Sequence, residues 1–428
     1  SISIPSFNLV NYRLHHCTTM FSKPIALCVK RRAATQTAIL NAVRYSSNLL
    51  LAVDKDDIRT THVIETPLLP LKENEVRVKV EKFALTSNTV TYGKVGEKIG
   101  YFGFYPTDHP SLRCVPAIGW SRVIESKVPG IDVGSKYFGW YPMSKYCTVE
   151  AAVSRSGFRD RGEHRKPHAD VYTEHTRTDL DAFRDSNMAQ KSETDYDDRQ
   201  AILRGLFLTS YLADEYLADE SNYFNVSSII IVSASSKTAL GIAQRLSNKK
   251  KSLNGSKSLK VVGVTSAGNA AFVKSTGFYD ETVTYETIDQ AISSDDNAVV
   301  IDMSGNKSVI SSIHHHLGDH VKHSMAIGLS HHDAGDAPQG VQLPGAPPTF
   351  FFAPAEVARR LKEWGPEEFY KRSNAALSLF IAGSQDWMKV DHVYGVNDVQ
   401  REWLNVYDGK VLPSVGMIAS MHEKGADF

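Results

Sequence analysis

The chain has 428 residues, of which 42% are hydrophobic and 10% aromatic, so it is long enough for two or three globular domains. Its 48 Lys and Arg residues balance its 48 Asp and Glu residues, so no overall charge favours nucleic acid or an anionic membrane as a partner. No apolar run reaches about 18 residues, and we expect no membrane-spanning helix. The four cysteines (Cys17, Cys28, Cys114 and Cys147) lie far apart, which argues against a disulfide framework and a cysteine zinc site. This usage suits a reducing compartment, and we expect a cytoplasmic protein.

The N-terminal extension, residues 1–50, has an unusual composition. It contains Lys and Arg, with scattered Ser, Thr and Ala, but neither Asp nor Glu. This bias is typical of a mitochondrial transit peptide, which would make the protein mitochondrial. The alternative is an untidy, disordered extension ahead of a start at Met20. No fold is predicted for this segment under either interpretation.

Residues 51–205 are predicted to form a β domain. Residues 75–81 alternate apolar and charged side chains with period two, as a half-buried strand does. Similar strands are expected at 115–126 and 146–150, and frequent Gly and Pro residues favour a small barrel of short strands. Residues 151–200 are polar and poor in aliphatic side chains, so we expect a long surface insertion there.

Residues 206–345 alternate strands and helices after a helical pattern that begins near residue 197. The expected strands are 229–232, 259–265, 280–285, 298–303 and 322–328, and the expected helices are 238–247, 268–276 and 309–317. This alternation predicts an α/β fold with a doubly wound parallel sheet. Residues 346–428 are predicted to hold two further helices and a strand near 416–420 that returns to the first domain.

The turn Val232–Gly241 lies between the first of these strands and its helix, where a nucleotide-binding turn usually carries glycines. Here serines and a lysine replace them. One interpretation is a phosphate cradle made of hydroxyls, amides and a cation, and the other is an ordinary turn with a serine N-cap. The candidate cofactor contacts in this turn are Ser233, Ser235, Ser236, Lys237, Thr238 and Gly241.

The end of the second strand bears on the choice of nucleotide. An NAD-selective site has an acidic residue there to hold the ribose 2′-hydroxyl. This strand ends instead in Thr265 and Ser266, followed by Asn269, which leaves room for a 2′-phosphate and favours NADPH over NADH. Lys237 or Asn269 is the candidate contact to that phosphate. Gly305 and Gly328 follow later strands and are further candidate cofactor contacts.

Several blocks resemble the medium-chain dehydrogenase/reductase superfamily. They are PLLPLKENEVRVKV (67–80), ALTSNTVTYG (84–93) and VGSKYFG (133–139). Residues 261–285 are similar to the quinone-oxidoreductase branch. Within it, the turn at 233–241 with FFFAPA (350–355) and EWGP (363–366) resembles a little-characterised family recorded as a domain of unknown function.

The resemblance implies a GroES-like β domain followed by a Rossmann domain, with NADPH as cofactor. It also implies a zinc-independent reductase that transfers hydride to an activated C=C or carbonyl of a small molecule. Tyr92 and Asn88 match the region that lines the substrate cleft of that superfamily, and Tyr92 is the candidate proton donor. A homodimer is expected from the superfamily alone.

Two alternatives stay open. Because the glycine fingerprint is absent, the chain could instead be a non-catalytic cofactor-binding protein or a partner protein that retains the fold. The histidines near His314–His316 could suggest a metal, but consecutive histidines on a helix point in different directions. We therefore expect no metal site.

Overall fold

A computed structural model describes residues 47–252, 259–327 and 343–426. The chain divides into two units. The first comprises Ser1–Asn48 and Thr66–Leu69, and only residues 47, 48 and 66–69 of it are described. The second comprises Leu49–Glu65 and Pro70–Phe428, and it holds both large sheets and the candidate site.

The first large sheet contains eight strands and closes partly on itself. Across the sheet these are β16 (Lys389–Tyr394), β17 (Val415–Ser420), β3 (Glu75–Ala84), β5 (Pro116–Ser126), β6 (Lys136–Pro142), β9 (Glu174–Arg177), β8 (Gly157–Asp160) and β7 (Tyr146–Val153). Because β7 also pairs with β3, the strands from β3 to β7 form a closed barrel. β17 pairs antiparallel with β3, so the end of the chain returns to this sheet. A small separate sheet contains β2 (Thr61–Pro67), β1 (Ser47–Asp54) and β4 (Leu112–Cys114).

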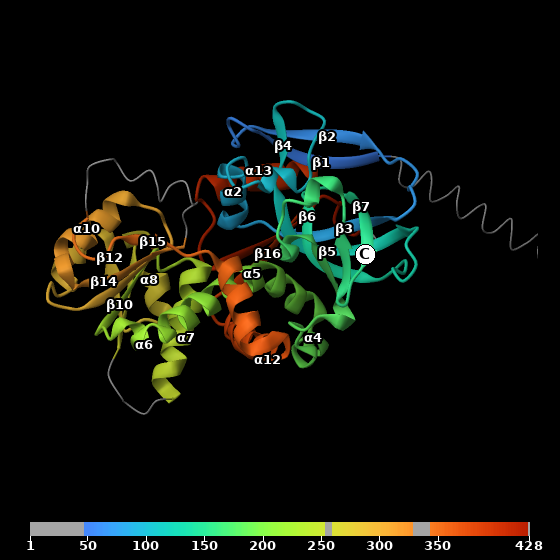
Figure 1. The fold of residues 1–428 in the computed structure, drawn as a ribbon. Coiled ribbons are helices and arrows are strands. Elements are labelled where there is room, and N and C mark those ends of the chain that lie inside the picture. The colour runs from blue at the N-terminus through green and yellow to red at the C-terminus, as the bar shows by residue number, and fades with distance from the viewer. Residues whose placement is uncertain (1–46, 253–258, 328–342, 427–428) are drawn as a thin grey trace, which may run out of the picture. The chain divides into compact units, whose positions relative to one another are not determined.

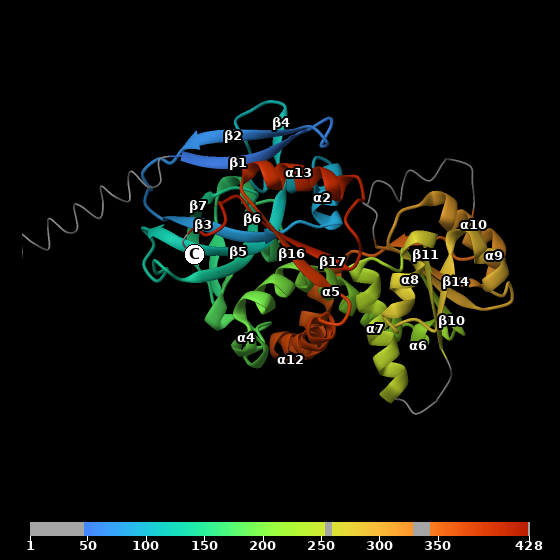
Figure 2. The same cartoon turned by 180° about the vertical axis from the view of Figure 1, so that it is seen from behind.

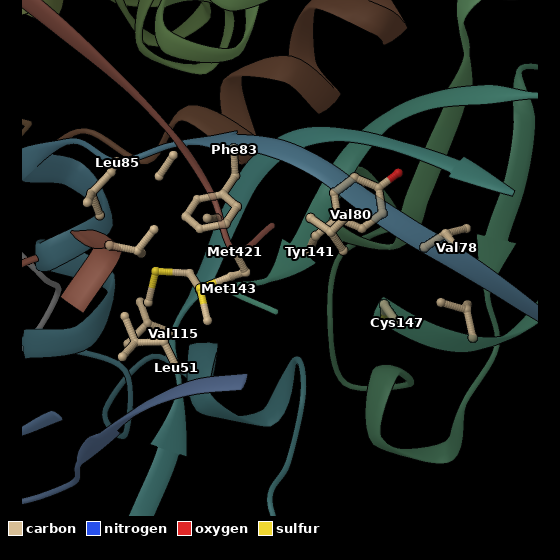
Figure 3. Close-up of a cluster of buried hydrophobic side chains, with 14 of the residues drawn as sticks. Leu51, Val78, Val80, Phe83, Leu85, Val115, Tyr141, Met143, Cys147 and Met421 are labelled. Carbon is tan, nitrogen blue, oxygen red and sulfur yellow. The ribbon is translucent and has the colours of Figure 1, made fainter. Parts of the chain in front are cut away.

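The barrel interior is apolar because the strands alternate inward and outward side chains. Val78, Val80 and Phe83 of β3 are fully buried. They gather with Tyr141 and Met143 in one core (Figure 3). Burial of such side chains contributes about 1.5–3 kcal/mol each, and this holds the barrel wall in place beside the site.

The prediction of a surface insertion at residues 151–200 is wrong, since its first half adds strands to the barrel and its second half buries Phe183 and Tyr196 in a hydrophobic core. β8 and β9 lie inside the barrel sheet, between β6 and β7. Phe158 of β8 and His175 of β9 are fully buried, and their rings stack with centroids 4.6 Å apart. Strands of four residues are too short to show a clear period of two, which explains why this polar stretch resembles surface. The short helices α3 (Asp170–Thr173) and α4 (Ser186–Lys191) complete the segment.

The second large sheet is parallel throughout. Its order is β12 (Glu281–Thr284), β11 (Lys260–Thr265), β10 (Ser228–Val232), β13 (Ala298–Asp302), β14 (Val321–Ala326) and β15 (Pro348–Phe350). Counted along the chain this is the 3-2-1-4-5-6 order of a doubly wound dinucleotide-binding sheet. The order reverses between β10 and β13, so a crevice is expected outside the carboxyl ends of these two strands.

Of the three helices predicted for the parallel sheet, two are longer than expected and one has the expected length, and a fourth, short helix was not predicted. Those of the parallel sheet are α7 (Lys237–Ser252), α8 (Ala267–Ser275), α9 (Ile288–Ala291) and α10 (Lys307–Leu317). α5 (Glu193–Asp219) runs through residue 205 and is followed by the short α6 (Ser221–Phe224). It packs beside α12 (Ala353–Gly383), which is kinked at Gly365, where φ is +76° (Figures 1 and 2).

Two further helices lie by the barrel. α2 (Ser87–Lys94) follows β3, and α13 (Val396–Tyr407) packs against it (Figure 2). Trp403 of α13 is fully buried, and its indole Nε1 donates to the Ile58 carbonyl at 2.9 Å. α2 is thereby held at one end of the barrel. None of the helices in the described ranges is long and apolar enough to cross a membrane.

Candidate functional site

The turn between β10 and α7 keeps one feature of a glycine-rich turn without its glycines. Ser233 has a φ of +59°, in the left-handed region that glycine adopts without steric cost. Ser236 caps the helix, because its Oγ accepts a hydrogen bond from the Ala239 amide at 3.2 Å. The chain therefore makes the sharp strand-to-helix turn at an expense of about 1–2 kcal/mol of backbone strain at Ser233.

Three backbone N–H groups at this turn are left without a protein acceptor in the described part of the chain. They belong to Ser235, Lys237 and Thr238. All three residues line a large cleft. Unpaired amides at a helix start, together with the helix dipole, attract an anion. The turn thus offers a phosphate group several backbone donors, as a glycine-rich turn does.

The Lys237 side chain reaches away from the turn toward β17. Its Nζ donates to the Val415 carbonyl at 2.8 Å and to the Pro413 carbonyl at 3.3 Å. Burial lowers the pKa of Lys237 to about 8 and is the sole cause of the shift. No carboxylate in the described ranges forms an ion pair with it. Its predicted contact to a 2′-phosphate stays a prediction.

The end of β11 contributes one residue to the cleft. Asn269 lines it, and its Nδ2 donates to the Ser235 Oγ at 3.1 Å, which ties the ends of β10 and β11 together. Thr265 is buried, and neither Thr265 nor Ser266 lines the cleft. Of the three predicted residues, the structure therefore brings only Asn269 to the turn.

The end of β13 is organised by a carboxylate that the sequence interpretation missed. Asp302 is buried and accepts hydrogen bonds from the Ser304 amide at 2.8 Å, the Ser304 hydroxyl at 2.9 Å and the Gly305 amide at 3.1 Å. The amide of Gly305, a predicted cofactor contact, is thus already paired with Asp302. The sequence signal that could have revealed Asp302 is an acidic residue at the end of the apolar run AVVID (298–302). Gly328 lies outside the described residues.

Gly241 has a different role from the predicted cofactor contact. A Cβ at this position would lie 2.5 Å from the Ser210 Oγ and 3.1 Å from the Phe207 ring, both on α5. The glycine therefore allows α7 to pack closely against α5. It does not line the cleft.

The two predicted catalytic residues lie together on α2. Asn88 and Tyr92 are four residues apart and share one face of the helix. The Asn88 Nδ2 donates a hydrogen bond to the Tyr92 hydroxyl oxygen, and both residues line the cleft. Burial raises the pKa of Tyr92 well above its usual value. The phenol therefore stays protonated, and its hydrogen remains free to be donated.

An aromatic cluster surrounds Tyr92. Its ring lies 4.7 Å from that of Tyr101 and 5.1 Å from that of Trp140. Tyr172 lies 5.4 Å from Trp140, and its hydroxyl is 3.3 Å from that of Tyr101. Trp140 and Tyr172 were missed because the first lies in a strand and the second in the stretch interpreted as surface. Such a wall excludes water and favours a flat, unsaturated ligand.

These elements line one cleft of about 2110 Å³ within the second unit. It extends from the turn before α7 to the aromatic cluster and along α12, where Leu361 and, just before the helix, Phe351 add apolar surface. Ligand pockets usually measure about 300–1,000 Å³, so this cleft has room for a dinucleotide and a second molecule. Within the described ranges, no group of three or more His, Cys, Asp and Glu side chains is arranged to hold a metal ion.

Comparisons with known proteins agree with this architecture. The structure matches CurA from Vibrio vulnificus with a TM-score of 0.50 at 10% identity, over 88% of this chain and 99% of that one. It matches CurA from the same organism in complex with NADPH with a TM-score of 0.51 at 11% identity, again over 88% and 99% of the two chains. The predicted fold, a GroES-like β domain followed by a Rossmann sheet, is confirmed.

Comparisons of the sequence alone identify a family. No curated protein matches the chain. A family profile, described as "Protein of unknown function (DUF2855)", matches residues 83–412, which confirms the second resemblance seen in the sequence. The matched segment includes β10, the turn, α7, most of the barrel and most of the residues that line the cleft. The chain therefore belongs to the family of proteins of unknown function DUF2855.

Proposed function

We propose that the chain is an NADPH-dependent reductase that acts, without a catalytic zinc, on an activated C=C or carbonyl of a small molecule. The observation that carries this proposal is the single cleft that combines free amides at the start of α7 with a protonated phenol in an aromatic wall. The fold shared with CurA, a protein crystallised with NADPH, is consistent with it.

The residues at the switch point fit a dinucleotide. The amides of Ser235, Lys237 and Thr238 would bind the pyrophosphate at the start of α7. Asn269 would fix the orientation of Ser235, to which it is hydrogen-bonded. The absence of an acid at the end of β11 favours NADPH over NADH, because nothing there repels a 2′-phosphate.

The residues at the aromatic end fit a carbonyl substrate. NADPH supplies the hydride when it is bound. Tyr92 would donate a hydrogen bond to the oxygen that gains negative charge, and Asn88 would hold the phenol in that orientation. Tyr101, Trp140 and Tyr172 would exclude water from the reacting atoms.

A pair of variants at Lys237 tests the amide cradle. Lys237 is the first residue of α7, where proline is well tolerated, so Lys237→Pro removes the side chain and the amide hydrogen together. Lys237→Ala removes the side chain alone. Because a charge-assisted hydrogen bond contributes about 1.5–3 kcal/mol, the proline variant should bind NADPH about 10- to 100-fold more weakly than the alanine variant. Equal affinities of the two folded variants, measured by calorimetry, would contradict the cradle.

Turnover is tested by supplying NADPH with enones, quinones and aldehydes while nicotinamide absorbance is followed. We expect oxidation of NADPH with at least one of these classes. NADPH binding without turnover of any of them would favour the non-catalytic alternative.

A further inference from the structure

Arg204 is a guanidinium in the cleft wall that the proposed function does not use. It lies near the middle of α5, and it lines the cleft. The central carbon of its guanidinium, Cζ, lies 4.3 Å from the ring centre of Phe138 and 4.4 Å from that of Phe183. Two such cation–π contacts restrict the orientation of the planar group.

A carboxylate fixes one corner of this guanidinium. The Nη1 of Arg204 donates to the Asp181 Oδ2 at 2.7 Å, and the Asp181 side chain is only 1% exposed. The other oxygen of Asp181 accepts from the Phe183 amide at 2.9 Å, so the carboxylate cannot turn to follow another ligand. Arg204 is therefore positioned before any ligand arrives.

The rest of the guanidinium faces the cleft. An arginine has five N–H donors in a fixed fork, and Asp181 takes one of them. Within the described residues no acceptor pairs with the Nε or the Nη2, and neither nitrogen is among the buried side-chain atoms that lack a partner. Since the side chain is 14% exposed and lines the cleft, these donors are open to it.

Arg159, another arginine that lines the cleft, differs from Arg204. The Nε of Arg159 donates to Glu174 at 2.8 Å, and its Nη1 donates to Asp170 at 2.7 Å. Carboxylates of the protein itself thus accept hydrogen bonds from two nitrogens of the Arg159 guanidinium. Arg159 therefore serves as a matched control for Arg204.

The position of Arg204 relates it to the aromatic cluster. Phe138, whose ring it contacts, and Trp140 are two residues apart on β6, so they lie on the same face of the strand, about 6–7 Å apart. A ligand whose flat unsaturated group lies beside Trp140 could therefore extend a substituent along β6 to Phe138 and reach Arg204 there.

We propose that Arg204 binds a carboxylate of the substrate, so that the substrate class is an unsaturated carbonyl compound that bears a carboxylate. The fork of a guanidinium matches a carboxylate through two parallel hydrogen bonds, which a neutral amide or ester cannot accept equally well. That the bound carboxylate belongs to a substrate rests on the proposed reductase function. The anion site itself does not depend on turnover.

The test compares two ligands of nearly the same shape, the anion benzoylpropionate and its neutral amide, benzoylpropionamide. Binding of each is measured by calorimetry with and without NADPH. The protein should bind the acid about 10- to 100-fold more tightly than the amide. Arg204→Lys should lose most of this preference, because lysine keeps the pairing with Asp181 but lacks the fork. Arg159→Lys should retain it.

A double variant controls for misfolding caused by an unpaired buried charge. Arg204→Met combined with Asp181→Leu removes the buried pair together and leaves no unpaired carboxylate. It should bind acid and amide equally. An absence of preference in the unaltered protein, or an unchanged preference in either Arg204 variant, would overturn the inference. Failure of NADPH to bind, with the acid preference intact, would instead count against the reductase proposal alone.

Discussion

The affinity for NADPH should fall as the pH rises through 8, because Lys237 loses its charge there. Lys237 is the first residue of α7, and burial lowers the pKa of its amine, which donates to the Val415 carbonyl, to about 8. A unit negative charge about 4 Å from the amine contributes about 1 kcal/mol in water and about 4 kcal/mol at an effective dielectric constant of 20, which raises the pKa by about one to three units. A bound pyrophosphate would therefore keep Lys237 protonated, and binding would take up a proton.

The magnitude follows from the protonated fraction of the free protein. With a pKa of about 8, this fraction falls from about nine-tenths at pH 7 to about one-tenth at pH 9. If only the protonated form binds well, the association constant falls about tenfold over this interval, or about 1.4 kcal/mol. At pH 8 binding should take up about half a proton. Phosphate groups do not interfere, since their second pKa is about 6.

Calorimetry at pH 7, 8 and 9 measures the affinity, and two buffers of different ionisation enthalpy at pH 8 measure the proton uptake. Lys237→Arg stays charged throughout and should bind NADPH with no such pH dependence. Lys237→Met should bind weakly at every pH. An affinity of the unaltered protein that does not change between pH 7 and 9, or an equal decline in Lys237→Arg, would refute the reasoning.

Three substitutions test other parts of the site. Tyr92→Phe should lower kcat about 100-fold or more in steady-state kinetics once a substrate is found, with NADPH affinity unchanged; an unchanged kcat would remove the phenol from catalysis. Gly241→Ala should lower the free energy of unfolding in urea by about 1–3 kcal/mol, since a Cβ would lie 2.5 Å from the Ser210 Oγ. Gly268→Ala, where nothing lies within 4 Å, should not, and equal effects would contradict the close packing of α5 and α7. Asp302→Ala should lower the unfolding free energy by about 2–4 kcal/mol, because two amides and a hydroxyl lose their acceptor; a change below about 0.5 kcal/mol would show that water replaces it.

The parallel sheet could be predicted from the sequence because its strands are short apolar runs separated by helices of clear periodicity. β10 and β13 are buried on both faces, and such strands give continuous runs of aliphatic residues. β8 and β9 could not be predicted, since each has four residues and His175 looks polar although it is fully buried. Tertiary packing, not local pattern, places that histidine inside the barrel.

The sequence predicted those site residues whose place in the fold follows from their order along the chain. Ser235, Lys237 and Thr238 follow a strand and begin a helix, so their amides must be near the switch point. The direction of the Lys237 side chain depends on β17, nearly 180 residues later, and no local signal reveals it. Arg204 was missed for the same reason, because its ring neighbours Phe138 and Phe183 come from other segments.

Titration of the purified protein with NADPH and with NADH, under the same conditions at pH 7, tests the proposed cofactor site most directly. The free amides at α7 and the acid-free end of β11 predict saturable binding of NADPH, about tenfold or more tighter than that of NADH. Binding of neither nucleotide would mean that the turn from Ser233 to Thr238 is only a strand-to-helix connection. Tighter binding of NADH would contradict the role assigned to the end of β11.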